Sequence, residues 1–471
     1  MTGGNESEEG RKGEGSFEVS DDQGPGSSEG TLQGSGFQAD KLAPRREILA
    51  WAMFDFANSS YTTVVTTAIF NQYFVGTICQ GMSAADATVK LTTALGVSNL
   101  LVVLSAPLIG ALADASGRKK LLLFLATALC VAATALLSLM HRGDVLPAML
   151  LFIISSFAFG STEYLIAAFL PELAPREKMG KISALGWTLG YVGGLCVLGL
   201  CHVYVSWAQK QGQEAFQYVP MILLGVSAVF AVSAAPTFIW LRERSLKQTG
   251  GGPGLTAVIG QSFKRVGDTI GGARRYRDLF VFLISLFAFS CGSTTVVAMA
   301  AVYAGQVMGF STSETIAMIM LVNVAAAGGA FGLGLLQDRI GSVRTLMLAL
   351  LLWVVAIAMA FAAHDKVVFW LAATIMGAAM GATGAAARAL VGQLSPSGQA
   401  AEFFGLWGLT VKLAAVVGPI SYGQITALSG GNYRFALLST LGFFLSGLVA
   451  IFFVDEKRGR QLAESTTRHH E

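Results

Sequence analysis

Three ionisable side chains stand inside long apolar stretches of this sequence: Asp55, Glu163 and Lys412. A charged side chain at the centre of a membrane span costs about 2.5 to 3.5 kcal/mol on insertion scales, so such residues are rare and mark candidate functional sites. Carboxylates and an ammonium group can hold a proton, form an ion pair or bind the charged groups of a solute. These residues are therefore the first candidates for the chemistry of the protein.

Asp55 begins a polar stripe, because Asn58, Ser59 and Thr62 follow it at helical spacing. Residues three and four apart lie on one face of a helix. A polar face avoids lipid, so it either lines a cavity or forms a hydrogen-bonded seam with other helices. We favour the cavity and keep the seam as the alternative.

Glu163, with Tyr164 beside it, and Lys412 each allow two interpretations. Glu163 either carries a coupling proton or binds a cationic part of a solute, or it forms a fixed salt bridge. Lys412 pairs either with a buried acid or with an anionic group of a solute. The five cysteines lie mostly in apolar runs and lack metal-ligand spacing, so we expect no metal and no cofactor. Motifs of hydrolases, metalloproteases and nucleotide-binding loops are missing from the sequence, so we expect no enzyme.

The elements that position these side chains are apolar runs near the length that a bilayer requires. The chain is 53% hydrophobic and only 13% charged, whereas soluble domains carry about 25% charged residues. We therefore predict an all-α membrane protein with twelve transmembrane helices. The runs are 48–78, 91–113, 121–140, 146–170, 182–205, 219–241, 279–307, 316–336, 346–363, 367–390, 403–428 and 435–454.

Basic residues concentrate in the loops on one side, together with both chain ends. Such loops are cytoplasmic in membrane proteins, so we predict that both termini are cytoplasmic. The Gly/Ser-rich segment 1–44 should be a disordered cytoplasmic tail. We expect a six-helix bundle over 45–242, a linker with an amphipathic helix over 243–277, a second six-helix bundle over 278–455 and a cytoplasmic tail over 456–471.

Two related short motifs follow apolar runs in the two halves of the sequence. They are Gly110-Ala-Leu-Ala-Asp114-Ala-Ser-Gly117-Arg118-Lys119-Lys120 and Gly334-Leu-Leu-Gln-Asp338-Arg339-Ile-Gly341-Ser-Val-Arg344. Both resemble the signature loop of the major facilitator superfamily, although Ala115 stands where that family prefers Arg, and Ser342-Val343 where it prefers basic residues. The resemblance implies two pseudo-symmetric six-helix bundles. It also implies that Asp114 and Asp338 cap helices of the opposite half and latch the cytoplasmic side shut; ordinary tight turns are the alternative. The gating and latch candidates are Gly110, Asp114, Gly117, Arg118, Gly334, Asp338, Arg339 and Gly341.

Further segments resemble the vacuole-effluxer branch of that superfamily, also called the unknown major facilitator family. They are Trp51-Ala-Met-Phe-Asp55-Phe-Ala-Asn58-Ser59, Ala168-Phe-Leu-Pro171-Glu172, the glycine-rich stretch from Gly186 to Gly194, and Glu402-Phe-Phe-Gly405 followed by Lys412 and Gly418-Pro419. In fungi that branch is associated with the release of amino acids from the vacuole.

We thus expect a secondary active transporter that moves a small polar or zwitterionic solute, with an amino acid as the leading candidate, by alternating access. Proton coupling and uniport both fit the sequence. A non-transporting receptor or a lipid-moving protein on the same scaffold is the alternative function. The expected partners are the solute, protons and the lipid bilayer, without nucleic acid, and we expect a monomer. A bacterial inner or plasma membrane is favoured over a vacuolar membrane.

Overall fold

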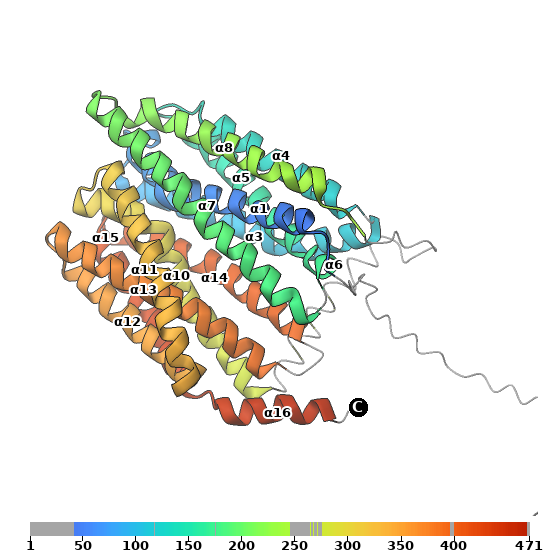
Figure 1. Ribbon diagram of the computed structural model, residues 1–471. Coiled ribbons are helices and arrows are strands. Elements are labelled where there is room, and N and C mark those ends of the chain that lie inside the picture. Colours follow the sequence, from blue (N-terminus) through green and yellow to red (C-terminus); the bar gives the residue numbers. More distant parts are fainter. Residues whose placement is uncertain are drawn as a thin grey trace, which may run out of the picture. The chain divides into compact units, whose positions relative to one another are not determined.

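The computed structural model of the chain describes residues 42–116, 118–174, 176–244, 264, 267, 271, 276–395 and 400–468 (Figure 1). These residues belong to one compact unit that runs from Phe37 to Glu471. Over the described residues the secondary structure is helical, without a strand. The predicted all-helical architecture is therefore confirmed for this part of the chain.

Eleven helices among the described residues are long and apolar enough to cross a membrane. The first half of the chain contributes α3 (Ala84–Ser116), α4 (Lys119–Leu137), α5 (Val145–Ala167), α7 (Arg176–Lys210) and α8 (Ala215–Trp240). The second half contributes α10 (Arg277–Met308), α11 (Thr312–Ile340), α12 (Ser342–Ala362), α13 (Lys366–Leu394), α14 (Ala400–Leu428) and α15 (Tyr433–Phe452). Two shorter helices are α6 (Leu170–Leu173) and α16 (Glu456–Arg468).

The predicted first span, 48–78, is the one missing from this count, because it is divided into four pieces. They are α1 (Arg45–Tyr61), the π-helix η1 (Thr62–Ala68), α2 (Phe70–Tyr73) and the π-helix η2 (Phe74–Ile78). The run of β-branched residues 62–67 disfavours a regular α-helix. Its threonines also bond back to the preceding turn, since the Thr63 hydroxyl donates to the Ser59 carbonyl at 2.7 Å. Single π-helical turns of this kind often occur at functional sites.

Most helix contacts lie within each half, and several further contacts join the halves. In the first half α1 packs on α7 and α8, while α5 packs on α3 and α4; in the second half α10 packs on α14 and α15, while α13 packs on α11 and α12. Contacts between the halves are made mainly by α3 with α14 and by α7 with α11 (Figure 1). The pieces η1 and α2 of the divided first span also contact α10, so three regions of the described chain join the halves.

Two ends of the helix array differ in how the halves are joined. We call the end at which α1 begins and α15 finishes the terminal end, and the opposite end the far end. Hydrogen bonds cross between the halves near the far end, including Thr88 to Tyr433 at 2.7 Å and Ser206 to Ser313 at 2.8 Å. The buried Asn71 amide also donates to the Ala298 carbonyl at 2.7 Å. The far end is thus tied together by direct contacts.

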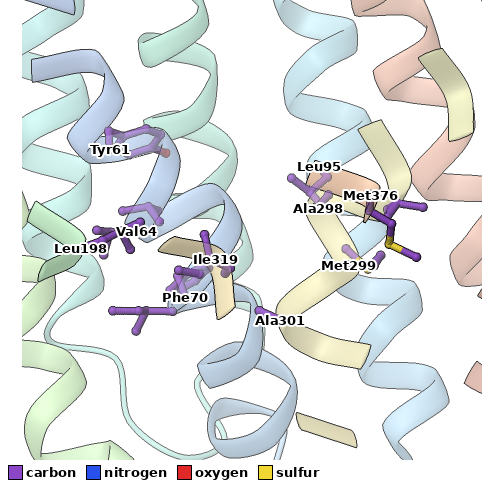
Figure 2. Close-up of a cluster of buried hydrophobic side chains, with 14 of the residues drawn as sticks. Tyr61, Val64, Phe70, Leu95, Leu198, Ala298, Met299, Ala301, Ile319 and Met376 are labelled. Atoms are coloured by element: carbon purple, nitrogen blue, oxygen red, sulfur yellow. The ribbon is translucent and has the colours of Figure 1, made fainter. Parts of the chain in front are cut away.

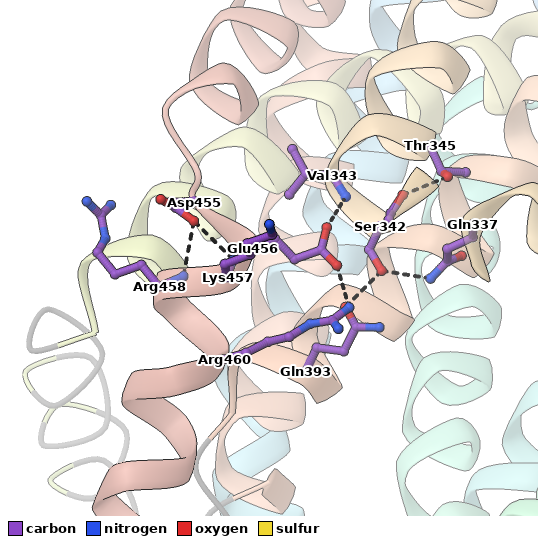
Figure 3. Close-up of polar contacts among 11 residues, drawn as sticks. Gln337, Ser342, Val343, Thr345, Gln393, Asp455, Glu456, Lys457, Arg458 and Arg460 are labelled. Atoms are coloured by element: carbon purple, nitrogen blue, oxygen red, sulfur yellow. Dashed lines mark hydrogen bonds and ion pairs between the residues drawn. The ribbon is translucent and has the colours of Figure 1, made fainter. Parts of the chain in front are cut away.

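At the terminal end of each half, a carboxylate that follows the last long helix binds the start of the third predicted span, which is α4 in the first half and α12 in the second. Glu243, just after α8, accepts hydrogen bonds from the backbone N–H groups of Lys119 and Lys120 at the start of α4. Glu456, just after α15, accepts from the backbone N–H of Val343 at 3.0 Å at the start of α12 (Figure 3). Carboxylates at these positions satisfy unpaired N–H groups and favour the positive helix end.

The second signature motif is held by side chains of its own half. Gly341 joins α11 to α12 with a φ of 91°, a conformation that favours glycine. The Ser342 hydroxyl donates to Gln393 of α13 at 2.8 Å and accepts from Gln337 at 2.9 Å (Figure 3). A neutral hydrogen-bonded contact therefore occupies this position.

Several predictions fall on parts of the chain outside the described residues. They include the tail 1–41 and most of the linker, of which Lys264, Gly267 and Gly271 are described and are helical. The side chains of Asp114 and Asp338 also lie outside the described part, as does Gly117 as a whole. The latch between the halves therefore stays a prediction.

Candidate functional site

The polar face of α1 divides into two parts with different surroundings. Asp55, Ser59 and Thr62 are partly accessible, whereas Asn58 is buried. The Asn58 side-chain oxygen accepts a hydrogen bond from Thr162 of α5 at 3.4 Å. The stripe therefore has both features that the sequence allowed. Asn58 forms a hydrogen-bonded seam with α5, while the side chains of Asp55, Ser59 and Thr62 stay partly accessible to solvent.

The glycines of α7 fit against this polar face. A Cβ atom at Gly190 would lie 2.9 Å from the Ser59 hydroxyl, and one at Gly193 would lie 2.8 Å from the Phe56 carbonyl. Gly186 leaves equally little room beside the Asp55 carboxylate. Small residues let two helix backbones approach closely, so this glycine stripe fixes Asp55 against α7.

Glu163 and Lys412 form an ion pair that crosses between the halves. The Lys412 ammonium group of α14 donates to the Glu163 carboxylate of α5 at 2.8 Å. The Lys412 and Glu163 side chains keep 26% and 40% of their surfaces exposed, respectively. The pair is therefore not sealed in protein, and other charged groups can compete for each partner.

Asp55 belongs to the same neighbourhood, because it lies close enough to Glu163 for the two charges to interact. Tyr164 interacts in the same way with both Lys412 and Glu163. We call Asp55, Glu163 and Lys412 the ionic group. The structure thus brings together three side chains that the sequence singled out in α1, α5 and α14, and their formal charges leave one negative charge unbalanced.

A cavity of about 190 Å³ lies further along α1, where η1 meets the second half. Thr62, Thr63 and Thr67 line it from the first half, and apolar side chains of α10, α11 and α13 form most of the remaining wall. Of these residues only Thr62 was a sequence candidate. The others were missed because an uncharged hydroxyl or a methionine in an apolar run gives no signal of a site.

The latch candidate Arg339 and the basic residue Arg388, which stands near the end of the apolar run 367–390, have other surroundings. Arg339 is exposed near the end of α11. Arg388 of α13 has its guanidinium 5.7 Å from the centre of the Trp407 ring, a cation–π contact within the second half. The side chain of Glu402 lies outside the described residues.

The helical spans, the two joined halves and the ionic group between them define the class: a multi-pass membrane transporter of the major facilitator type. Solved structures share the fold. The nucleoside transporter NupG has a TM-score of 0.63 with 15% identity, covering 86% of this chain and 97% of that one. The D-xylose–proton symporter has a TM-score of 0.62 with 15% identity, covering 88% and 98%, respectively.

Within that class, the family model described as "Vacuole effluxer Atg22 like" matches residues 75–464, and the chain belongs to this family. The uncharacterized MFS-type transporter YxiO of Bacillus subtilis (strain 168) is 27% identical over 418 residues, covering 88% of this chain and 96% of YxiO. Autophagy-related protein 22-1 of Penicillium rubens is 24% identical over 327 residues, covering 62% of this chain and 54% of the fungal protein. The chain thus matches about half the length of that fungal relative. By name, YxiO and the nucleoside transporter NupG are transporters, and the D-xylose protein is a symporter.

Proposed function

We propose that the chain moves a small polar or zwitterionic organic solute, with an amino acid as the leading candidate, by alternating access. The observation that carries this proposal is the Glu163–Lys412 ion pair, which joins the halves at 2.8 Å while staying partly accessible. A zwitterion carries the same two charges, so its carboxylate can replace Glu163 beside Lys412. Its ammonium group then faces Glu163 and Asp55.

This exchange of partners supplies a reason for the halves to move. An ion pair between the halves favours the conformation that brings Glu163 and Lys412 together. A solute that pairs with each of them separately removes that preference, and a ligand shifts a conformational equilibrium only through such a difference in binding. The far end is tied by hydrogen bonds here, so the opposite conformation requires those bonds to open.

The unbalanced charge of the ionic group favours an additional cation, either a proton or the ammonium group of the solute. The D-xylose symporter, a structural neighbour, carries a proton by its name. One measurement therefore distinguishes proton coupling from uniport: the response of solute uptake to a pH gradient. We also propose that Asp114 and Asp338, with Arg118 and Arg339, latch the terminal end in the opposite conformation, and that this end is cytoplasmic.

Asp55→Asn tests the proposal in purified protein reconstituted into liposomes with a mixture of labelled amino acids. We expect wild-type protein to accumulate label and Asp55→Asn to fall to the level of empty liposomes, because the amide carries no charge. Asp86→Asn is the matched control, since Asp86 is an exposed residue at the start of α3 whose carboxylate bonds Ser83. Full uptake by Asp55→Asn would refute the role of this residue. An absence of uptake by wild type, with and without a pH gradient, would refute the amino acid as the solute.

A further inference from the structure

The cavity beside η1 is lined almost entirely by side chains that cannot carry charge. Met376 of α13 lies beside Met299 of α10 (Figure 2), and Trp353, Phe369 and Ile319 extend the apolar wall. Methionine is flexible and polarisable, and it adapts to irregular apolar shapes. Such a lining suits an apolar group and allows some variation in its outline.

One fully buried polar atom in the described wall has no hydrogen-bond partner. The Tyr422 hydroxyl is buried, with 1% of the residue exposed, and it makes no hydrogen bond to protein atoms in the described part of the chain. The hydroxyls of Thr62 and Thr63 differ, because they donate to the carbonyls of Asn58 and Ser59. A buried hydroxyl without a partner is costly and calls for an explanation. Tyr422 is among the residues that line the cavity, so a ligand atom that reaches its covered hydroxyl can supply the partner.

The cavity is separate from the ionic group but near enough for one extended molecule to reach both. Thr62 follows Asp55 by seven residues, so helical rise places it about 10 Å further along α1. Tyr422 follows Lys412 by ten residues on α14, a rise of about 15 Å. A solute held by its charged groups at the ionic group therefore needs a body of about 10 Å to enter the cavity.

We propose that the cavity binds the apolar body of an amphipathic solute whose charged head lies at the ionic group. The far end of that body carries a hydrogen-bond acceptor that pairs with the Tyr422 hydroxyl. This inference rests on the proposed function for the charged head, and it adds a requirement for length and for an acceptor at the end. A short solute satisfies the ionic group alone.

The probe for this inference is 4-(4-nitrophenyl)-L-phenylalanine, which has a zwitterionic head, a biphenyl body long enough to extend from the ionic group into the cavity, and a nitro acceptor at the far end. Nitroaromatic groups quench tryptophan, and Trp353 lines the cavity. We expect saturable quenching of the purified full-length protein in lipid nanodiscs. Ala373→Phe places a ring inside the cavity and should weaken binding by about tenfold or more, the size of a lost apolar contact.

Tyr422→Phe removes a single oxygen atom and is expected to fold. It should weaken the probe by about two- to tenfold, the range of one hydrogen bond. Competition by 4-phenyl-L-phenylalanine, which has the same body and lacks the acceptor, should be unchanged in this variant. The controls are Val232→Phe, at a residue of α8 that is 72% exposed, and Tyr204→Phe, whose ring stacks on Trp207. Both should bind like wild type.

The outcomes separate this inference from the proposed function. Weaker binding in both Asp55→Asn and Ala373→Phe supports the two together. If Asp55→Asn weakens the probe while Ala373→Phe and Tyr422→Phe do not, the proposed head site stands and the cavity inference is overturned. If Ala373→Phe weakens binding and Asp55→Asn does not, the cavity binds its ligand but the charged-head assignment fails. Equal affinity in Tyr422→Phe alone overturns the role given to its hydroxyl.

Discussion

The Glu163–Lys412 contact joins residues that are 249 positions apart in the sequence. An ion pair of this kind has two possible roles, a fixed structural bridge or a binding site for charged groups. Removing one partner leaves the other charge without compensation, whereas removing both does not. The two roles therefore differ in how single and double variants behave.

We predict that Lys412→Met lowers stability by about 1 to 3 kcal/mol, less than the loss of about 3 to 5 kcal/mol for a fully buried pair, because both side chains are partly exposed. The double variant Glu163→Gln/Lys412→Met should regain most of that stability but should not transport. Thermal denaturation and liposome uptake measure the two properties separately. Wild-type uptake by the stable double variant would show that the pair is only structural.

The ionic residues could be predicted from sequence because a charge in an apolar run has a known cost, so its presence requires a reason. Whether these three side chains lie close together could not be read from the sequence, and the structure places them in one neighbourhood. Tyr422 and Thr67 carried no comparable signal, since hydroxyls are common in membrane helices and can bond to the backbone of their own helix. A missing hydrogen-bond partner is visible only in three dimensions.

At the scale of the helix, α1 and α7 are set by close contact between a polar face and a glycine stripe. A Cβ atom at Gly193 would meet the carbonyl and Cα of Phe56, which are backbone atoms that cannot turn away. The helices must then separate, and the separation also displaces Ser59 and Asp55. This packing therefore links the glycine spacing to the geometry of the ionic group.

Gly193→Ala should destabilise the protein by about 1 to 3 kcal/mol, the usual cost of overpacking. Gly225→Ala on α8 is the matched control, because a Cβ there meets nothing within 4 Å. That variant should be neutral or slightly stabilising, since alanine favours helix over glycine. Thermal denaturation in one detergent compares the two. Equal stability of both variants would contradict the close-contact explanation.

The long helices could be predicted from hydropathy and length, which detect eleven of the twelve predicted spans as helices of membrane-spanning length in the described residues. The division of 48–78 into α- and π-helical pieces could not, because hydropathy does not report hydrogen-bond register. The β-branched run 62–67 is the one sequence feature that marks the position. In the structure this β-branched run forms η1 and contributes three threonines to the wall of the cavity.

For the whole molecule, the contacts at the far end define which conformation the structure represents. The hydroxyls of Ser206 on α7 and Ser313 on α11 are 2.8 Å apart, and His202 also contacts Ser313. Single serine and threonine contacts of this kind have no signature in the sequence, so the closed far end could not be predicted. Alternating access requires these contacts to open once in each cycle.

We predict that a disulfide between Ser206→Cys and Ser313→Cys stops transport by holding the far end closed. The two hydroxyls are near enough for sulfur atoms at those positions to bond without a large backbone shift. The native Cys196 and Cys201 are replaced by serine to prevent other pairings. Uptake into liposomes should be lost on oxidation and return on reduction, while Ser206→Cys alone stays active. Normal uptake with the disulfide formed would rule out opening at this end.

The paired carboxylates Glu243 and Glu456 have a consequence for the energetics of a transport cycle. Glu243 links the end of α8 to the start of α4, and Glu456 links the end of α15 to the start of α12. Both contacts lie within one half, so neither has to exchange partners when the halves change their relative positions. The N–H groups at the starts of α4 and α12 then stay satisfied throughout turnover. The barrier to each turnover falls on the few polar contacts that do exchange, which makes the cycling rate sensitive to single hydrogen bonds at the boundary and tolerant of changes deep inside either half.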